Sequence, residues 1–225
     1  MNILVHIWKD IWQKHKFKKP LSYFIFMKIF AFTDVHGSEH LIQEVIKTIK
    51  SKKPELIICP GDLTIFGHDL EKILSKFDKL KISCLVVHGN HESDDELKDA
   101  CKKFKNIIYL HRGVLEKGDY AFFGYGGDGF STKDEKFEKI SEIVGKKTKG
   151  KNLIMITHQP PHGNKLDYLE YFEHVGNKSY TKFIKKWKPV MSIFGHLHEH
   201  FGKMDHINKK TILINPGPLG KLIEI

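Results

Sequence analysis

The chain has 225 residues, of which 40% are hydrophobic, so it can bury the core of one ordinary domain, and no Pro/Ser-rich linker or internal repeat divides it. Its three cysteines include no C-x-x-C pair, which argues against a disulfide scaffold and favours reduced core thiols in a cytoplasmic protein. The net charge of +10 favours anionic substrates, but the lysines are spread along the chain rather than gathered with aromatic residues in a nucleic-acid-binding run.

Residues 1–26 differ from the rest of the chain. Their apolar residues share one helical face and precede four closely spaced lysines, a pattern compatible with a basic helix at a membrane interface. Charges interrupt the segment too often for a transmembrane span, and it lacks a signal-peptide cleavage pattern. Because Met27 directly precedes the first predicted strand, we expect residues 1–26 to be a poorly packed extension and residues 27–225 to form the domain.

Five apolar runs are predicted to be strands buried on both faces. In chain order they are residues 28–33, 55–59, 82–87, 152–157 and 190–194. Between the first two runs, residues 39–50 repeat apolar side chains at helical spacing, and Ser38 is a candidate N-cap. Alternating strands and helices predict an α/β sheet, whose ligands gather outside the carboxyl ends of its strands.

Shorter strands are predicted in the second half of the chain. Residues 112–116 and 120–125 are expected to form a hairpin, and a second antiparallel group is expected near the C-terminus. The strands of that group are predicted at residues 201–204, 211–214 and 222–225. The glycine-rich segment 124–129 lacks P-loop spacing, so we expect a loop at a strand end, with Asp128 as a candidate substrate contact.

Five short motifs contain most of the residues suited to chemistry, and most of them follow an apolar run. They are Asp34-Val35-His36, Gly61-Asp62, Gly89-Asn90-His91-Glu92, His158 and Gly195-His196-Leu197-His198. Residues i and i+2 of an extended backbone point to the same side, so the paired side chains of the first and last motifs are each expected to face one place.

These five motifs, in this order, resemble the pattern D-x-H, G-D, G-N-H-[DE], H and G-H-x-H of the calcineurin-like metallophosphoesterase superfamily. The resemblance extends from Lys28 to about Gly217. It implies a four-layer α-β-β-α sandwich in which two mixed β-sheets are flanked by helices. It also implies two metal sites with Asp34, His36 and His198 on one metal, Asn90, His158 and His196 on the other, and Asp62 bridging both.

The expected ligands are carboxylates, imidazoles and an amide, which suit Mn, Fe, Co, Ni or Zn better than the all-oxygen shells of Mg or Ca. We expect two divalent ions, with Mn as the first candidate, to hold a hydroxide nucleophile and clamp the phosphoryl oxygens. By resemblance, His91 is catalytic: it stabilises the transition state or protonates the leaving oxygen. Glu92 could orient that imidazole, in competition with Asp94 and Asp95, or could be a solvated carboxylate at a helix start.

The resemblance implies a dinuclear-metal-dependent phosphoesterase that hydrolyses phosphodiester or phosphomonoester bonds of a small molecule or nucleotide. Arg112 is the only arginine and His88 precedes Gly89, which disfavours the phosphoprotein phosphatase branch with its phosphate-gripping arginines. Substrate choice is expected to depend on loops 63–69, 125–131 and 159–175. His162 and His200 lie near the motifs and could contact substrate.

Two alternatives remain open. A metal-dependent nuclease would share every metal ligand, although no basic arm or aromatic-basic run supports a nucleic-acid partner. A non-catalytic protein-binding scaffold of the same fold is disfavoured because no expected ligand is substituted.

Overall fold

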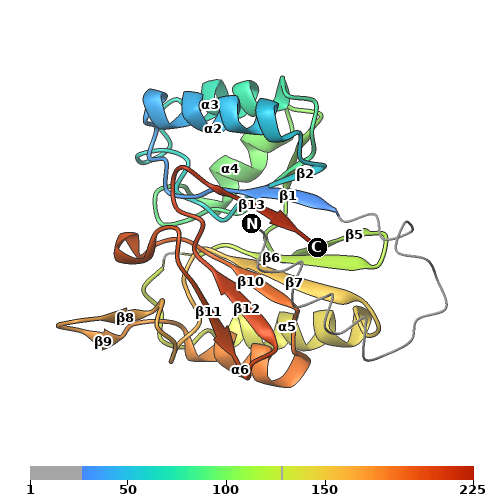
Figure 1. The fold of residues 1–225 in the computed structure, drawn as a ribbon, viewed down its shortest axis with the longest axis vertical. Coiled ribbons are helices and arrows are strands. Elements are labelled where there is room, and N and C mark those ends of the chain that lie inside the picture. Colours follow the sequence, from blue (N-terminus) through green and yellow to red (C-terminus); the bar gives the residue numbers. More distant parts are fainter. Residues whose placement is uncertain (1–26, 128) are drawn as a thin grey trace.

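The computed structural model describes residues 27–127 and 129–225 (Figure 1). The expectations for residues 1–26 and for Asp128 lie outside the described residues. Two β-sheets face each other between two layers of helices, which confirms the four-layer sandwich (Figure 1). None of the helices in the described part combines the length and the apolar character needed to cross a membrane.

The first sheet has the strand order β13-β1-β2-β3-β4. Strands β1 to β4 run parallel, and β13 pairs antiparallel with β1. The bounds are β1 Lys28–Ala31, β2 Leu56–Cys59, β3 Cys84–Val86, β4 Ile107–Tyr109 and β13 Lys221–Glu224. Three helices cover its outer face: α2 Glu39–Lys52, α3 Leu70–Asp78 and α4 Asp94–Cys101. The Ser38 side chain accepts a hydrogen bond from Leu41 N and caps α2 as predicted.

The second sheet has the strand order β11-β12-β10-β7-β6-β5. Its four central strands run parallel, and β11 and β5 pair antiparallel at the two edges. The bounds are β5 Gly113–Lys117, β6 Tyr120–Tyr125, β7 Asn152–Thr157, β10 Met191–Ile193, β11 Met204–Ile207 and β12 Thr211–Ile214. Helices α5 Glu135–Lys147 and α6 Lys178–Trp187 cover this sheet from the other side (Figure 1). A small hairpin of β8 Tyr168–Leu169 and β9 Glu173–His174 projects from the body.

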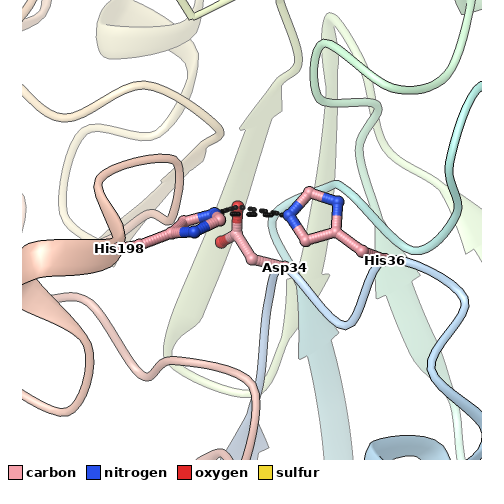
Figure 2. Close-up of side chains that lie close together, drawn as sticks. All are labelled: Asp34, His36 and His198. Carbon is pink, nitrogen blue, oxygen red and sulfur yellow. Dashed lines mark hydrogen bonds and ion pairs between the residues drawn. The ribbon is translucent and has the colours of Figure 1, made fainter.

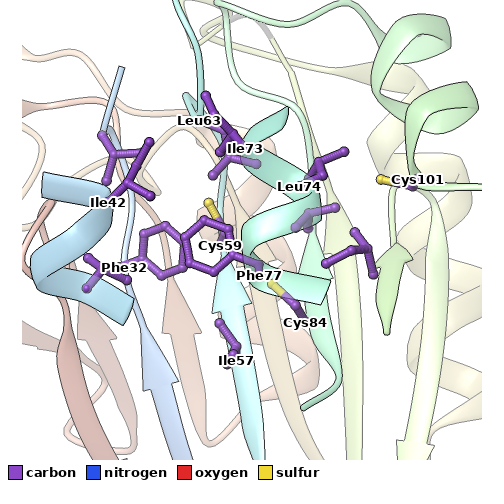
Figure 3. Packing of buried hydrophobic residues seen from close by; sticks show 14 of the residues in the cluster. Phe32, Ile42, Ile57, Cys59, Leu63, Ile73, Leu74, Phe77, Cys84 and Cys101 are labelled. Carbon is purple, nitrogen blue, oxygen red and sulfur yellow. The ribbon is translucent and has the colours of Figure 1, made fainter. Parts of the chain in front are cut away.

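Alternating side chains of the strands fill three separate layers of core. In β1, Phe30 faces the cluster shared with α2, α3 and α4, whereas Ile29 and Ala31 face the cluster between the sheets. Figure 3 shows part of the first cluster, which includes Cys59. All three cysteines are buried and unpaired in that layer, in agreement with their prediction as core thiols.

The five predicted buried strands are confirmed, and so is the predicted hairpin, now β5 and β6. The predicted C-terminal antiparallel group is wrong in its composition. Only β11 and β12 pair in that way, whereas β13 joins the first sheet beside β1. Residues 201–203 form turns after the 3₁₀ helix η2 His198–His200, and β11 begins at Met204.

Candidate metal centre

All five motifs lie in loops at the carboxyl ends of parallel strands. In the first sheet they follow β1, β2 and β3, and in the second sheet they follow β7 and β10. Backbone hydrogen bonds join neighbouring loops: His36 N donates to Asp62 O at 3.0 Å, and Gly195 N donates to His158 O at 2.9 Å. The two sheets therefore bring their motif loops to one place, as expected for an α/β edge.

The direction of the ligand side chains comes from turns and not from extended backbone. Asp34, His36, Asp62 and His196 have φ values of 54°, 45°, 53° and 70°, in the left-handed region. Our assumption of an extended backbone, in which residues i and i+2 point to the same side, was therefore wrong, although Asp34 and His36 do converge. Non-glycine residues rarely adopt this conformation, and its cost is typically concentrated at functional sites.

Asp34, His36 and His198 form the first group of candidate ligands, and Figure 2 shows their polar ends pointing toward one another. His36 Nε2 and His198 Nε2 lie 3.3 Å apart, at 3.9 Å and 3.6 Å from Asp34 Oδ1. The Asp34 carboxylate also accepts a hydrogen bond from His196 N, at 3.1 Å to Oδ2. This bond ties the carboxylate of the first sheet to the β10 loop of the second.

Asn90, His158 and His196 gather in the second group, next to Asp62. Asn90 Oδ1 lies 2.9 Å from His158 Nε2 and 3.1 Å from His196 Nδ1. Asp62 Oδ2 lies 3.4 Å from His158 Nε2 and 3.9 Å from His36 Nε2, which places this carboxylate between the two groups.

Two motif glycines are required by the close approach of loops to these carboxylates. A Cβ on Gly89 would lie 2.1 Å from Asp62 Oδ1, and one on Gly195 would lie 2.2 Å from Asp34 Oδ2. No side chain could occupy either space without displacing a candidate ligand. The glycines of the G-N-H-E and G-H-x-H motifs therefore have a packing role.

The electrostatics of the centre are dominated by the buried pair of Asp62 and His158. Burial alone would raise the pKa of Asp62, but the hydrogen bond and charge of His158 outweigh it and lower that pKa to about 2. Burial alone would lower the pKa of His158, but the hydrogen bond and charge of Asp62 raise it to about 9. Burial, and then the charge of His158, lowers the pKa of His196 to about 4.

The residues present fit divalent metal ions. Ligand atoms of Asp34, Asp62 and His158 lie within 4.8 Å of one another, as do those of the first group. His158 Nδ1 lies 3.0 Å from Pro60 O, and because a carbonyl only accepts, Nδ1 is the donor. Its Nε2 then faces the centre, which is the arrangement usual for metal-binding histidines. Carboxylate, amide and imidazole donors together match first-row transition metals.

His91 lies inside the centre, beside the candidate ligands. Its backbone N–H donates to Asp62 Oδ1 at 3.1 Å, and its ring centroid is 4.7 Å from that of His36. Its Nδ1 is buried and makes no hydrogen bond to any described residue. His91 also forms a third candidate metal-binding group with His36 and Asp62, so position alone does not separate a ligand from a proton donor.

The sequence suggested that Glu92 orients the His91 imidazole or is a solvated carboxylate at a helix start, and the structure shows neither arrangement. Its side chain is buried and accepts hydrogen bonds from Asp62 N, Gly89 N, Thr64 N and the Thr64 hydroxyl, at 2.8–3.3 Å. Glu92 is therefore not a solvated carboxylate. Its oxygens accept hydrogen bonds from these four donors, and His91 Nδ1 donates none to it. Glu92 holds together the loops after β2 and β3.

The other carboxylates and histidines considered have separate contacts. Asp94 accepts from the Tyr109 hydroxyl at 2.6 Å and Asp95 is exposed, so neither orients the Nδ1 of His91. His200 Nε2 lies 2.8 Å from Tyr168 O, which fastens the β8–β9 hairpin to the region after the last motif. His162 lies in the loop between β7 and β8, where its ring packs against that of His174 with centroids 5.5 Å apart.

Sequence reasoning missed two phenylalanines that border the centre. Phe66 packs against His91 in a tilted arrangement and Phe130 packs against His196 edge to face, each with ring centroids 4.7 Å apart. Both side chains are largely exposed, Phe66 by 78% and Phe130 by 75%. Their loops were predicted to set substrate choice, but no periodicity or motif singled out these residues within them.

The family model described as "Calcineurin-like phosphoesterase" matches residues 27–200, and the chain belongs to this family. The UPF0046 protein K07C11.7 of Caenorhabditis elegans is 27% identical over 214 residues, which cover 87% of this chain and 71% of that protein.

Solved structures share the fold. TT1561 of Thermus thermophilus has a TM-score of 0.70 at 14% identity, covering 88% of this chain and 98% of that chain. A dimetal phosphatase from Danio rerio has a TM-score of 0.64 at 11% identity, covering 83% of this chain and 86% of that chain.

Proposed function

We propose that this member of the calcineurin-like phosphoesterase family hydrolyses a phosphomonoester or phosphodiester with two divalent metal ions, Mn being the first candidate. The observation that carries the proposal is the convergence of seven side chains from both sheets. They are Asp34, His36, Asp62, Asn90, His158, His196 and His198. In this assignment Asp34, His36 and His198 would hold one ion, Asn90, His158 and His196 would hold the other, and Asp62 would be shared by both.

The bound ions would activate water and neutralise charge on the phosphoryl oxygens. The chain's own contribution is to fix its ligands before substrate arrives. Asp62 stays ionised because its pKa is about 2, and the Pro60 carbonyl holds the His158 ring with Nε2 toward the centre. Gly89 and Gly195 let the backbone approach the two carboxylates closely. Such fixed ligands need little reorganisation during the reaction.

His91 is proposed as the proton donor to the leaving oxygen. The observation that supports this role is the position of the ring, whose centroid lies 4.7 Å from that of His36 in the centre. A well-placed general acid contributes about 10²–10⁴ in rate. The His91→Ala variant should keep its metal content and lose most turnover with poor leaving groups, whereas an equal loss for good and poor leaving groups would argue against an acid.

Turnover by metal-stripped protein after separate addition of Mn, Ni, Co, Zn or Mg tests the proposal. The substrates are p-nitrophenyl phosphate and bis-p-nitrophenyl phosphate, which report monoesterase and diesterase activity. Asp62→Asn and His158→Ala should each lower turnover by orders of magnitude and lower bound metal, measured by elemental analysis. The exposed residues Asp95 and His206 provide matched controls in Asp95→Asn and His206→Ala.

Three results would redirect the assignment. Unchanged turnover in both ligand variants would refute the metal centre proposed above. No turnover by the wild-type protein with any metal would favour a non-catalytic scaffold, and steeply salt-dependent binding of single-stranded oligonucleotides would favour a nuclease.

A further inference from the structure

Phe66 is exposed beside a residue of the proposed reaction. Its ring centroid lies 4.7 Å from that of His91 with an interplanar angle of 34°, so the two rings lie partly over one another. The side chain is 78% exposed, which leaves most of an aromatic ring in solvent at the centre.

Hydrogen bonds fasten the Phe66 loop to the motif that contains His91. Gly67 N donates to His91 O at 3.1 Å, and the Thr64 hydroxyl lies 3.4 Å from the same oxygen. Thr64 N also donates to Glu92 Oε1 at 2.8 Å. The backbone on both sides of Phe66 is therefore fixed relative to the His91 motif, and this places the Phe66 side chain beside His91.

The backbone of Phe66 is unusual for this residue type. Its φ of 49° lies in the left-handed region, where a bulky aromatic residue is an outlier. Phe66 lies in a turn that is closed by a hydrogen bond from His68 N to Ile65 O at 3.1 Å, and strain retained in such a place is commonly associated with ligand contacts.

We propose that Phe66 determines specificity by contacting the group carried on the leaving oxygen, and that the substrate is a phosphoester with an aromatic leaving group. The inference rests on the proposed function, in which His91 protonates that oxygen. If the leaving oxygen lies beside His91, the group attached to it lies beside Phe66, since the ring centroids are 4.7 Å apart. An aromatic pair of this kind gains attraction beyond simple area burial.

Phe130 provides a matched control. It has nearly the same exposure, 75%, and the same 4.7 Å ring separation from a histidine of the centre, but that histidine is His196. The proposal assigns the leaving group to the His91 side. Phe130→Ala should therefore leave discrimination between leaving groups unchanged, whatever its effect on turnover.

The test compares 2-naphthyl and phenyl esters, whose leaving alcohols have similar acidity but differ by one ring. The wild-type protein is first assayed with phosphate monoesters and with methyl phosphate diesters of both alcohols. The class that it hydrolyses is then used to compare it with the variants. We expect the wild-type ratio of kcat/KM, naphthyl over phenyl, to be about two- to tenfold. Phe66→Ala should bring the ratio close to one, Phe66→Trp should retain it, and thermal unfolding should show that both variants fold.

An equal effect of Phe66→Ala on both esters would overturn the proposal, because the ring would then only position His91 or support the loop. Loss of the ratio in Phe130→Ala but not in Phe66→Ala would overturn it as well. Equilibrium binding of 2-naphthylphosphonate and phenylphosphonate separates this inference from the proposed function, since these probes require no turnover. If the wild-type protein prefers the naphthyl probe and Phe66→Ala does not, the contact is supported even in a protein without turnover. If the wild-type protein shows no preference for the naphthyl probe, the contact is refuted.

Discussion

Glu92→Gln tests whether a buried carboxylate holds the loops of the metal centre together. Oε1 accepts from Thr64 N and the Thr64 hydroxyl, and Oε2 accepts from Asp62 N and Gly89 N. A glutamine keeps one acceptor oxygen. Its amide NH₂ group would face two N–H donors that it cannot satisfy.

The expected cost follows from the two hydrogen bonds that are lost with one acceptor oxygen. A hydrogen bond to a charged group contributes about 1.5–3 kcal/mol, so two of them set an upper value of about 3–6 kcal/mol. The substitution also removes a buried charge, and burial, followed by repulsion from Asp62, raises the pKa of Glu92. That relief offsets part of the loss, so we expect the free energy of unfolding to fall by about 2–4 kcal/mol.

Thermal and urea-induced unfolding of metal-stripped protein provide the assay. For a domain of this size, the expected loss corresponds to a decrease in Tm of about 4–16 °C. Glu170→Gln, the same substitution at an exposed position, should change stability by less than about 0.5 kcal/mol. If Glu92→Gln had the same Tm and free energy of unfolding as this control, the conclusion that the buried carboxylate holds the loops together would be refuted.

Three further predictions concern the centre and the domain boundary. In metal-free protein, the pKa of His158 is raised to about 9, so its contribution to stability is full below the ordinary pKa near 6.5 and is lost as the pH rises to 9. The pKa of Asp62 is lowered to about 2, so its contribution is lost only as the pH falls from about 4 to 2. Thermal unfolding at pH 6 and pH 9 should therefore show an alkaline loss in wild-type protein that His158→Gln lacks; the same loss in both would contradict the pairing. Gly89→Ala should reduce bound metal because its Cβ would lie 2.1 Å from Asp62 Oδ1, and normal metal content by elemental analysis would refute this. A protein starting at Met27 should fold and keep its turnover, since the three core layers and the family match both lie within residues 27–225; insolubility or inactivity of this truncation would assign a role to residues 1–26.

The candidate ligands were identified by the resemblance of the five motifs to the family pattern, and their common location could be predicted because each motif follows a buried strand closely. Asp34 and Asp62 lie three residues beyond β1 and β2, so strand prediction alone placed them at one sheet edge. Their side-chain directions could not be predicted, because left-handed turns at these residues replaced the extended backbone that we assumed.

Long-range partners account for what the sequence did not reveal. Glu92 binds donors at Asp62 and Thr64, about 30 residues earlier in the chain, and no local pattern links them. The pairing of β13 with β1 likewise joins the two ends of the domain, whereas its sequence only predicts a strand. Phe66 is an exposed aromatic residue in a loop, and its position over His91 depends on the turn that contains it.

The supply of candidate ligands by both sheets has a consequence for the order of folding. His36 and His198 are 162 residues apart in the chain, yet their Nε2 atoms lie 3.3 Å apart. Contacts between such distant residues require closure of long loops, which delays their formation. We therefore expect the centre to be completed only after both sheets have formed and docked, so that the binding of metal would report a late step in assembly of the native chain.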